Sequence, residues 1–243
     1  MISASSNALF GPELPLSHIW GSSGPFVQIA LYSIGMAIAF GLFTRVCSFL
    51  ALVLFTLAVS VYGWYMLTYI NYVGEIVVTL ILGGGMLSID HRMSSKSLRS
   101  HTIAIRKFFA HIEPYAFLVL RVLFGLAIIY ASWYAKIVHS NLALDVVADY
   151  HLTNYFHFSP LFLVLGAAIV ETVIGIFIMF GLEVRFAALV FLGFLTMSIG
   201  FFGEVVWPHL VLYGINLVLI FHGYDRYTLE GHFFKKRTIE PVL

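Results

Sequence analysis

The sequence predicts an all-α fold: a polytopic transmembrane helical bundle with seven spans, arranged as two parallel three-helix repeats linked by a central span. Of the 243 residues, 60% are hydrophobic and only 10% are charged, whereas a soluble domain carries about 25% charged residues. One stretch, 160–182, has Glu171 as its only charge, and roughly 20 apolar residues in a helix cross a bilayer core. The motif FGLFTR at 40–45 returns as FGLEVR at 180–185, which indicates the repeat.

Composition also restricts the partners. The net charge of +1 gives no overall field that would attract nucleic acid, so the lipid bilayer is the expected partner. The single cysteine, Cys47, excludes an internal disulfide and a CxxC motif. Residues 1–24 contain no Lys or Arg, and a cleavable signal peptide begins with a basic segment. We therefore expect residues 1–24 to stay on the protein as an N-terminal tail outside the cell.

The elements follow in order along the chain. The first three-span repeat, 25–92, begins with Pro25 at a helix start, where its missing N–H is harmless. A basic cytoplasmic loop at 93–114 separates it from a four-span unit at 115–223, and a cytoplasmic tail covers 224–243. The expected spans are 25–43, 46–65, 70–89, 115–134, 160–182, 186–205 and 208–222, with a long outer loop at 135–158.

The distribution of Lys and Arg predicts the orientation. Cytoplasmic loops of membrane proteins collect these residues. With the N-terminus outside, the inner segments hold Arg45, Arg185, five basic residues between spans three and four, and four in the tail, which together make eleven of the 13. We therefore predict a multi-pass protein of a bacterial-type plasma membrane, with its N-terminus outside and its C-terminus in the cytoplasm.

The repeat has a constant offset of 140 residues and needs no gap. Glycines and arginines match as well as the common apolar residues, and for this reason we favour a true duplication over chance matching of Gly-rich apolar sequence. Parallel repeats of this kind occur in membrane proteins. The matched pairs include Gly35 with Gly175, Gly41 with Gly181, Arg45 with Arg185, Gly63 with Gly203, and Gly74 with Gly214.

Three polar residues inside the expected spans are candidates for function. An ionisable side chain at membrane depth is costly and is a functional hypothesis by default. Counted from the inner helix ends, Arg121 lies roughly 9 Å deep and Glu171 roughly 16 Å deep, and a long Arg side chain covers much of that difference. Asn216 lies at nearly the depth of Arg121. The three form a candidate cluster, either a structural contact between helices or a site for a small molecule, a proton or a quinone.

A second group of candidates lies on the predicted outer face. Imidazole and carboxylate groups together suit zinc, copper or iron, but no tight ligand pattern such as HExxH is present. We therefore interpret these residues as solvated loop side chains and predict no metal. The outer-face candidates are Lys136, His139, Asp145, Asp149, His151, His157, Glu204 and His209.

The segments LRVLFGLAIIYASWYAKI at 120–137 and VETVIGIFIMFGLEVRFAAL at 170–189 resemble the DoxX family of small four-span membrane proteins. The resemblance covers 118–223 and implies a link to thiosulfate–quinone oxidoreduction and membrane redox complexes. The first half, through FGLFTR and through LSIDHR at 87–92, is also similar to the membrane region of the vitamin K-dependent carboxylase-like (HTTM) proteins. The matching positions in the second half are Arg121, Gly125, Lys136, Glu171, Gly175, Gly181 and Arg185.

These observations favour one function and leave two alternatives. By resemblance, the chain is expected to be an integral membrane subunit of a redox complex, with a quinone as candidate cofactor and other membrane or redox subunits as partners. The first alternative is a small-molecule transporter or permease-like protein with its site between the two repeats. The second is a carboxylase-like membrane enzyme with Lys136 as a candidate base. The three extra N-terminal spans and the long outer His/Asp loop depart from the family pattern and weaken the transfer of any single reaction.

Overall fold

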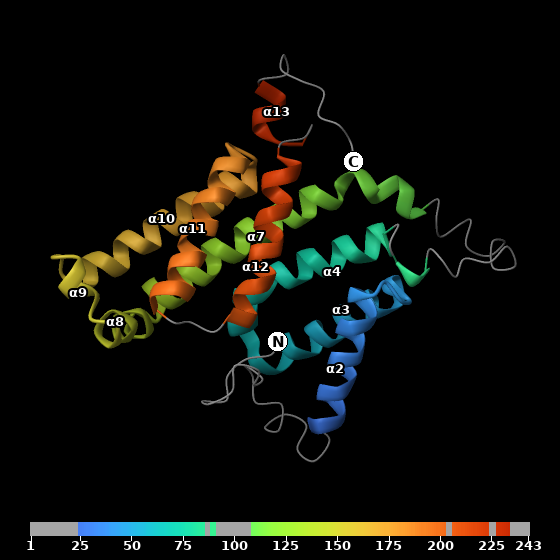
Figure 1. The fold of residues 1–243 in the computed structure, drawn as a ribbon, viewed down its shortest axis with the longest axis horizontal. Helices are drawn as coiled ribbons and strands as arrows, with labels where there is room; N and C mark the ends of the chain where they lie inside the picture. Colours follow the sequence, from blue (N-terminus) through green and yellow to red (C-terminus); the bar gives the residue numbers. More distant parts are fainter. Residues whose placement is uncertain (1–23, 86–87, 91–107, 203–205, 224–226, 234–243) are drawn as a thin grey trace, which may run out of the picture. The chain divides into compact units, whose positions relative to one another are not determined.

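The computed structural model describes residues 24–85, 88–90, 108–202, 206–223 and 227–233, and within these ranges all the regular structure is helical. The chain forms two compact units (Figure 1). Unit 1 comprises residues 1–66 and 71–120, and unit 2 comprises residues 67–70 and 121–243. A helix covers the centre of each of the seven expected spans, and the all-α prediction is confirmed for the part of the chain that the structure describes.

Unit 1 is built on α2 (Gly24–Ala39), α3 (Thr44–Tyr62) and α4 (Ile70–Leu82). The apolar run from Thr44 to Leu82 spans 39 residues, about twice what one crossing needs. It is a hairpin, because Arg45 Nη2 donates to the Ile81 carbonyl oxygen and the Ser48 hydroxyl bonds to that of Thr79. Between the two helices the backbone passes through η2 (Gly63–Tyr69). The chain therefore runs out along α3 and back along α4.

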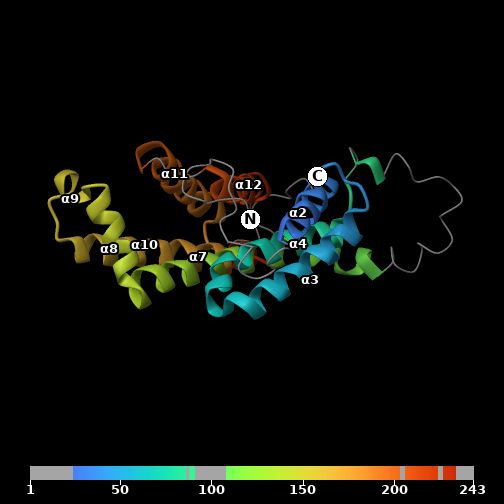
Figure 2. The same cartoon turned by 90° about the horizontal axis from the view of Figure 1, so that it is seen from below.

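Most of α7 (Ala116–Trp133) belongs to unit 2, and this helix continues into a π-helical turn, η5 (Tyr134–Val138). Then follow α8 (Ser140–Asp149), α9 (Leu152–Tyr155), α10 (Pro160–Phe180), α11 (Val184–Phe202), α12 (Val206–His222) and α13 (Leu229–Phe233). Figures 1 and 2 show α8 and α9 together at the start of α10. In the core, the rings of Phe124 and Phe191 meet edge to face at 5.7 Å.

The expected outer loop at 135–158 is the main difference between prediction and structure. Most of it is helical, as η5, α8 and α9. In α8, Val147 is buried while Asp145 and Asp149 are exposed, so one face packs on the unit and another carries the charges. This helix has only ten residues, which is too short for its periodicity to stand out in sequence.

The exposed surface of α10 is apolar and agrees with a lipid environment. Leu161, Leu165 and Ile169 are all more than half exposed and follow one another at helical spacing. Three helical stretches are long and apolar enough to cross a membrane, namely Thr44–Leu82, Phe108–Val138 and Pro160–Phe180. The shorter apolar helices are Phe26–Ala39, Val184–Gly200 and His209–His222.

The turns at 40–45 and 180–185 have the same backbone. Gly41 has φ 67°, and its N–H donates to the Ile38 carbonyl oxygen, while the Leu42 N–H donates to that of Ala37. This is the glycine C-cap of a helix in its Schellman form. The equivalent bonds recur 140 residues later, with Gly181 at φ 73° donating to Ile178, and Leu182 donating to Phe177.

A second pair of segments closes over these two turns. The Asp90 N–H donates to the Gly41 carbonyl oxygen, and the Glu230 N–H donates to that of Gly181. These donors are again 140 residues apart. A Cβ added to Gly41 would collide with Ser88, and one added to Gly181 would lie 2.6 Å from the Thr228 Cβ atom. Both turns therefore need glycine for a positive φ and for a close backbone approach.

Candidate functional site

The helices α7 and α10 pack closely in an antiparallel pair. Gly125 faces Gly175, and a Cβ added to Gly125 would lie 2.5 Å from the carbonyl oxygen of Gly175. The reverse substitution would bring the new Cβ to 2.8 Å from the carbonyl oxygen of Gly125. Small residues at such a contact let two membrane helices approach closely. The contact fixes the register of α7 against α10, and the register decides which polar side chains meet.

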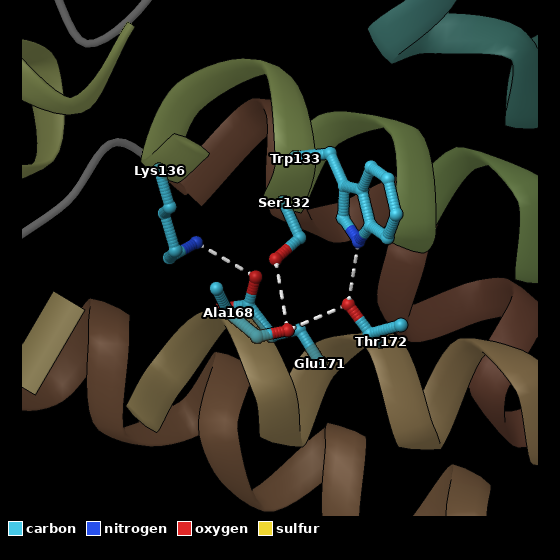
Figure 3. Close-up of polar contacts among 6 residues, drawn as sticks. All are labelled: Ser132, Trp133, Lys136, Ala168, Glu171 and Thr172. Carbon is cyan, nitrogen blue, oxygen red and sulfur yellow. Dashed lines mark hydrogen bonds and ion pairs between the residues drawn. The ribbon is translucent and has the colours of Figure 1, made fainter. Parts of the chain in front are cut away.

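The register places Lys136 of η5 beside Glu171 of α10. Lys136 Nζ lies 2.7 Å from Glu171 Oε2 and donates a hydrogen bond to it (Figure 3). Their side chains are 21% and 26% exposed. A charge-assisted contact of this kind is stronger than one between neutral groups, and each charge offsets the cost of placing the other among apolar helices.

Two further hydrogen bonds flank this ion pair, which we call the Lys136–Glu171 pair. The Trp133 indole N–H donates to the Thr172 hydroxyl at 2.9 Å, and that hydroxyl donates to the Ala168 carbonyl oxygen at 2.7 Å. Figure 3 shows these contacts on one side of the interface between α7 and α10. They orient the side chains next to both charges. Sequence reasoning did not select Thr172, although it is adjacent to Glu171.

The π-helical turn η5 lies directly at the pair. Its backbone bond joins the His139 N–H to the Tyr134 carbonyl oxygen, five residues earlier. Lys136 lies within this wider turn, which aligns its side chain with that of Glu171. The rings of Tyr134 and His139 stack at 4.4 Å. Single π-helical turns inside α-helices are frequent at functional sites.

The pair is accessible beside an apolar surface. Trp133 is 51% exposed and Ile137 is 50% exposed, and both flank Lys136 in sequence. A molecule dissolved in the bilayer would therefore meet apolar side chains first and then the charged groups. The arrangement suits an apolar ligand with a polar head, because an ammonium donates and a carboxylate accepts hydrogen bonds.

Among the described residues, the hydrogen bonds of Arg121, Glu171 and Asn216 reach three different partners. Arg121 is buried near Gly181, and its Nη2 donates to the Tyr227 carbonyl oxygen at 2.9 Å. Gly181 caps α10 ten positions after Glu171, or about 15 Å along the helix axis. Arg121 therefore lies opposite the end of α10 and not opposite Glu171. A joint role of Arg121 and Glu171 stays a prediction.

Asn216, the third member of that predicted cluster, is fully buried in α12. Its side-chain amide donates to the Leu212 carbonyl oxygen of the same helix at 2.7 Å. Its Oδ1 atom has no hydrogen-bond partner among the described residues. The observed bond anchors the side chain to its own helix, and participation in a shared site stays a prediction.

The outer-face candidates are spread over several elements. Lys136 lies in η5, His139 follows it, and Asp145 and Asp149 are exposed on α8. Among the described residues, no group of three or more His, Cys, Asp and Glu side chains could hold a metal ion. Glu204 lies outside the described residues, whereas His151 precedes α9 with φ 48°, His157 precedes α10 and His209 lies in α12.

Comparison with known proteins gives one match, and it lies in the second half of the chain. Residues 116–204 match the family model of DoxX. No curated protein and no solved structure matched the chain. The DoxX match extends from α7 through α11 and includes the Lys136–Glu171 pair. With the apolar helices, it indicates a membrane protein that contains a DoxX-like region. The similarity of the first half to the carboxylase-like proteins stays a prediction.

Proposed function

We propose that this protein is the integral membrane subunit of a redox complex, and that the Lys136–Glu171 pair binds the polar head of a lipid-soluble quinone. The observation that carries the proposal is the 2.7 Å contact between Lys136 Nζ and Glu171 Oε2, inside the DoxX-like region and next to exposed apolar side chains. Reduction of a quinone to a quinol takes up two electrons and two protons. The electrons would come from a partner redox subunit and the two protons from water.

The chemistry of the pair fits such a ligand. The Lys136 ammonium can donate a hydrogen bond to a quinone carbonyl oxygen, where negative charge develops on reduction. The Glu171 carboxylate can accept a hydrogen bond from the hydroxyl of the quinol. In this contact Lys136 is already a hydrogen-bond donor to Glu171, which favours the quinone site over the alternative in which Lys136 is a base.

The proposed topology is seven crossings, with two parallel three-helix repeats, a central α7 and the N-terminus outside. The α3–α4 hairpin supports two crossings within Thr44–Leu82. The matching backbone bonds at the turns after α2 and α10 support the repeat. Arg45 and Arg185 directly follow these turns, and the preference of basic residues for the cytoplasmic side supports placing both turns there.

Quinone binding to the purified protein in detergent tests the site. We expect Lys136→Met and Glu171→Gln each to weaken binding of a short-chain quinone by about tenfold to a hundredfold, because each removes a hydrogen bond to a charged group. Glu183→Gln is the matched control, since it removes one carboxylate from an exposed position after the other end of α10 and should leave binding unchanged. Wild-type affinity in both pair variants would refute the site.

Assembly with redox partners tests the other half of the proposal. The chain, tagged and purified from its native membrane in mild detergent, should carry other subunits and reduce quinone with an added electron donor. Lys136→Met should retain the subunits and lose the quinone reduction. A chain that purifies alone from its native membrane, with no quinone reduction, would contradict the redox-subunit assignment.

A further inference from the structure

A second carboxyl group lies within an apolar helix, in unit 1. Glu75 is in the middle of α4, and its Oε1 atom is buried without a hydrogen-bond partner in the part of the chain that the structure describes. Glu171 of unit 2, by contrast, bonds to an ammonium at 2.7 Å. Glu171 thus has a cationic partner, whereas the Oε1 atom of Glu75 has no hydrogen-bond partner among the described residues. Glu171 can therefore serve as the control for experiments on Glu75.

The α3–α4 hairpin gives Glu75 apolar neighbours in register. The contacts of Arg45 with Ile81 and of Ser48 with Thr79 place residues 51 and 52, an alanine and a leucine, opposite Glu75. Arg45 is the one basic residue of α3, and its bond to Ile81 is six residues, or about 9 Å, further along α4. Among the described residues of the hairpin, no cation therefore lies beside Glu75.

Two polar side chains, Asn71 and Thr79, share the helical face of Glu75. Asn71 precedes it by four residues, which is about one turn of α4, and is 4% exposed. A buried amide next to a carboxyl with one buried oxygen is a pair of groups that can exchange hydrogen bonds with a small guest. An apolar helix needs neither group for its own backbone bonds.

Physical chemistry restricts the form of such a carboxyl. An ionised carboxylate without a partner is very costly in apolar surroundings, and the group avoids this cost by carrying a proton. An ionisable residue at membrane depth without a structural partner is a functional hypothesis by default. We propose that Glu75 is a proton-binding site of unit 1, distinct from the Lys136–Glu171 pair, which holds its proton as a neutral carboxylic acid.

The test uses dicyclohexylcarbodiimide, a hydrophobic reagent that adds to protonated carboxyl groups within membranes. The full-length protein in its membrane is treated, digested and analysed by mass spectrometry. We expect the reagent on Glu75 and not on Glu171, with loss of that label in Glu75→Gln. The Lys136→Met variant is the positive control, because it removes the ammonium from Glu171 and should make Glu171 reactive. An unlabelled Glu75 in a sample where this Glu171 is labelled would overturn the proposal.

Thermal unfolding provides a second and independent measurement. Glutamine has nearly the shape of a neutral glutamic acid, so Glu75→Gln should change the midpoint by about 2 °C or less. Glu171→Gln loses the contact with Lys136 and should lower the midpoint by about 5 °C. A fall in Glu75→Gln as large as that in Glu171→Gln would mean that Glu75 is an ionised group with a partner, and would refute the proton site.

Discussion

The turns at 40–45 and 180–185 share a backbone and differ in their side chains. Both have a glycine with positive φ at the first helix end, and both place an arginine against a second glycine. A Cβ on Gly83 would lie 3.2 Å from Arg45 Nε, and a Cβ on Gly223 would lie 2.5 Å from Arg185 Nε. Both second glycines end a helix with φ 71°, where a guanidinium is favourable because it faces the negative end of the helix dipole.

The first turn is held by a carboxylate and by hydroxyl groups. The Asp90 carboxylate accepts hydrogen bonds from the N–H groups of Phe43 and Thr44, at 2.8 and 3.0 Å. Ser48 bonds to Thr79 at 2.9 Å. In unit 2 the positions equivalent to Thr44, Ser48 and Thr79 are apolar, and all three are buried, as Val184, Ala188 and Leu219.

The two turns therefore have the same backbone hydrogen bonds but different side-chain contacts. Unit 1 fastens its turn with hydroxyl and carboxylate groups. Unit 2 has apolar side chains at the positions of Thr44, Ser48 and Thr79, holds the Arg121 guanidinium against Gly181, and places its ion pair between α7 and α10. The carboxyl groups of Glu75 and Glu171 also lie at positions that are not equivalent in the two units. Glu75 corresponds to an isoleucine and Glu171 to a leucine at the 140-residue offset, so each unit carries a carboxyl of its own.

The strongest test of the shared backbone replaces the turn glycines. Gly41→Ala and Gly181→Ala should each destabilise the protein by about 3 kcal/mol, because alanine is strained at positive φ and its Cβ would collide with Ser88 or Thr228. Chemical unfolding in detergent measures the loss. Gly35→Ala in α2 and Gly193→Ala in α11 are matched controls with open space around the new Cβ. A large effect in one turn only would break the equivalence.

Much of this backbone could be predicted from sequence, because it depends on local signals. Apolar length located the helices, and the repeated Gly and Arg residues identified the two turns. The Lys136–Glu171 pair could not be predicted in the same way, because it depends on the register of two helices separated by a long segment. Depth counting paired Glu171 with Arg121 instead. The sequence also does not predict that Asp90 caps the start of α3, because Asp90 lies 46 positions after Thr44.

The second test concerns the register itself. Gly125→Ala should cost about 2 kcal/mol, because the new Cβ would lie 2.5 Å from the Gly175 carbonyl oxygen and 2.8 Å from the Met179 N atom. It should also weaken quinone binding, since Lys136 and Glu171 would lose their alignment. Gly166→Ala in α10 has open space around its Cβ and should gain up to about 1 kcal/mol. Equal behaviour of the two variants would show that this contact does not set the register.

The third test measures the ion pair by a double-mutant cycle. Lys136→Met and Glu171→Gln should each destabilise unit 2, and the coupling energy between them should be about 2 kcal/mol. This is below the value for a fully buried pair, because both side chains keep some exposure. The same cycle with Lys136→Met and Glu75→Gln should give no coupling. A coupling energy near zero for the first cycle would show that the Lys136–Glu171 pair does not stabilise unit 2.

The smallest expected effect concerns the hydroxyl contact that only unit 1 has. Ser48→Ala should lower stability by about 1 kcal/mol, because it removes the bond to Thr79 between α3 and α4. The Thr79 hydroxyl keeps its bond to the Ile76 carbonyl oxygen at 2.9 Å, which limits the loss. The reverse change, Ala188→Ser, puts a hydroxyl among apolar side chains and should also destabilise, by about 1 kcal/mol. If Ala188→Ser stabilised unit 2, the apolar packing there would not be an alternative solution to the same turn.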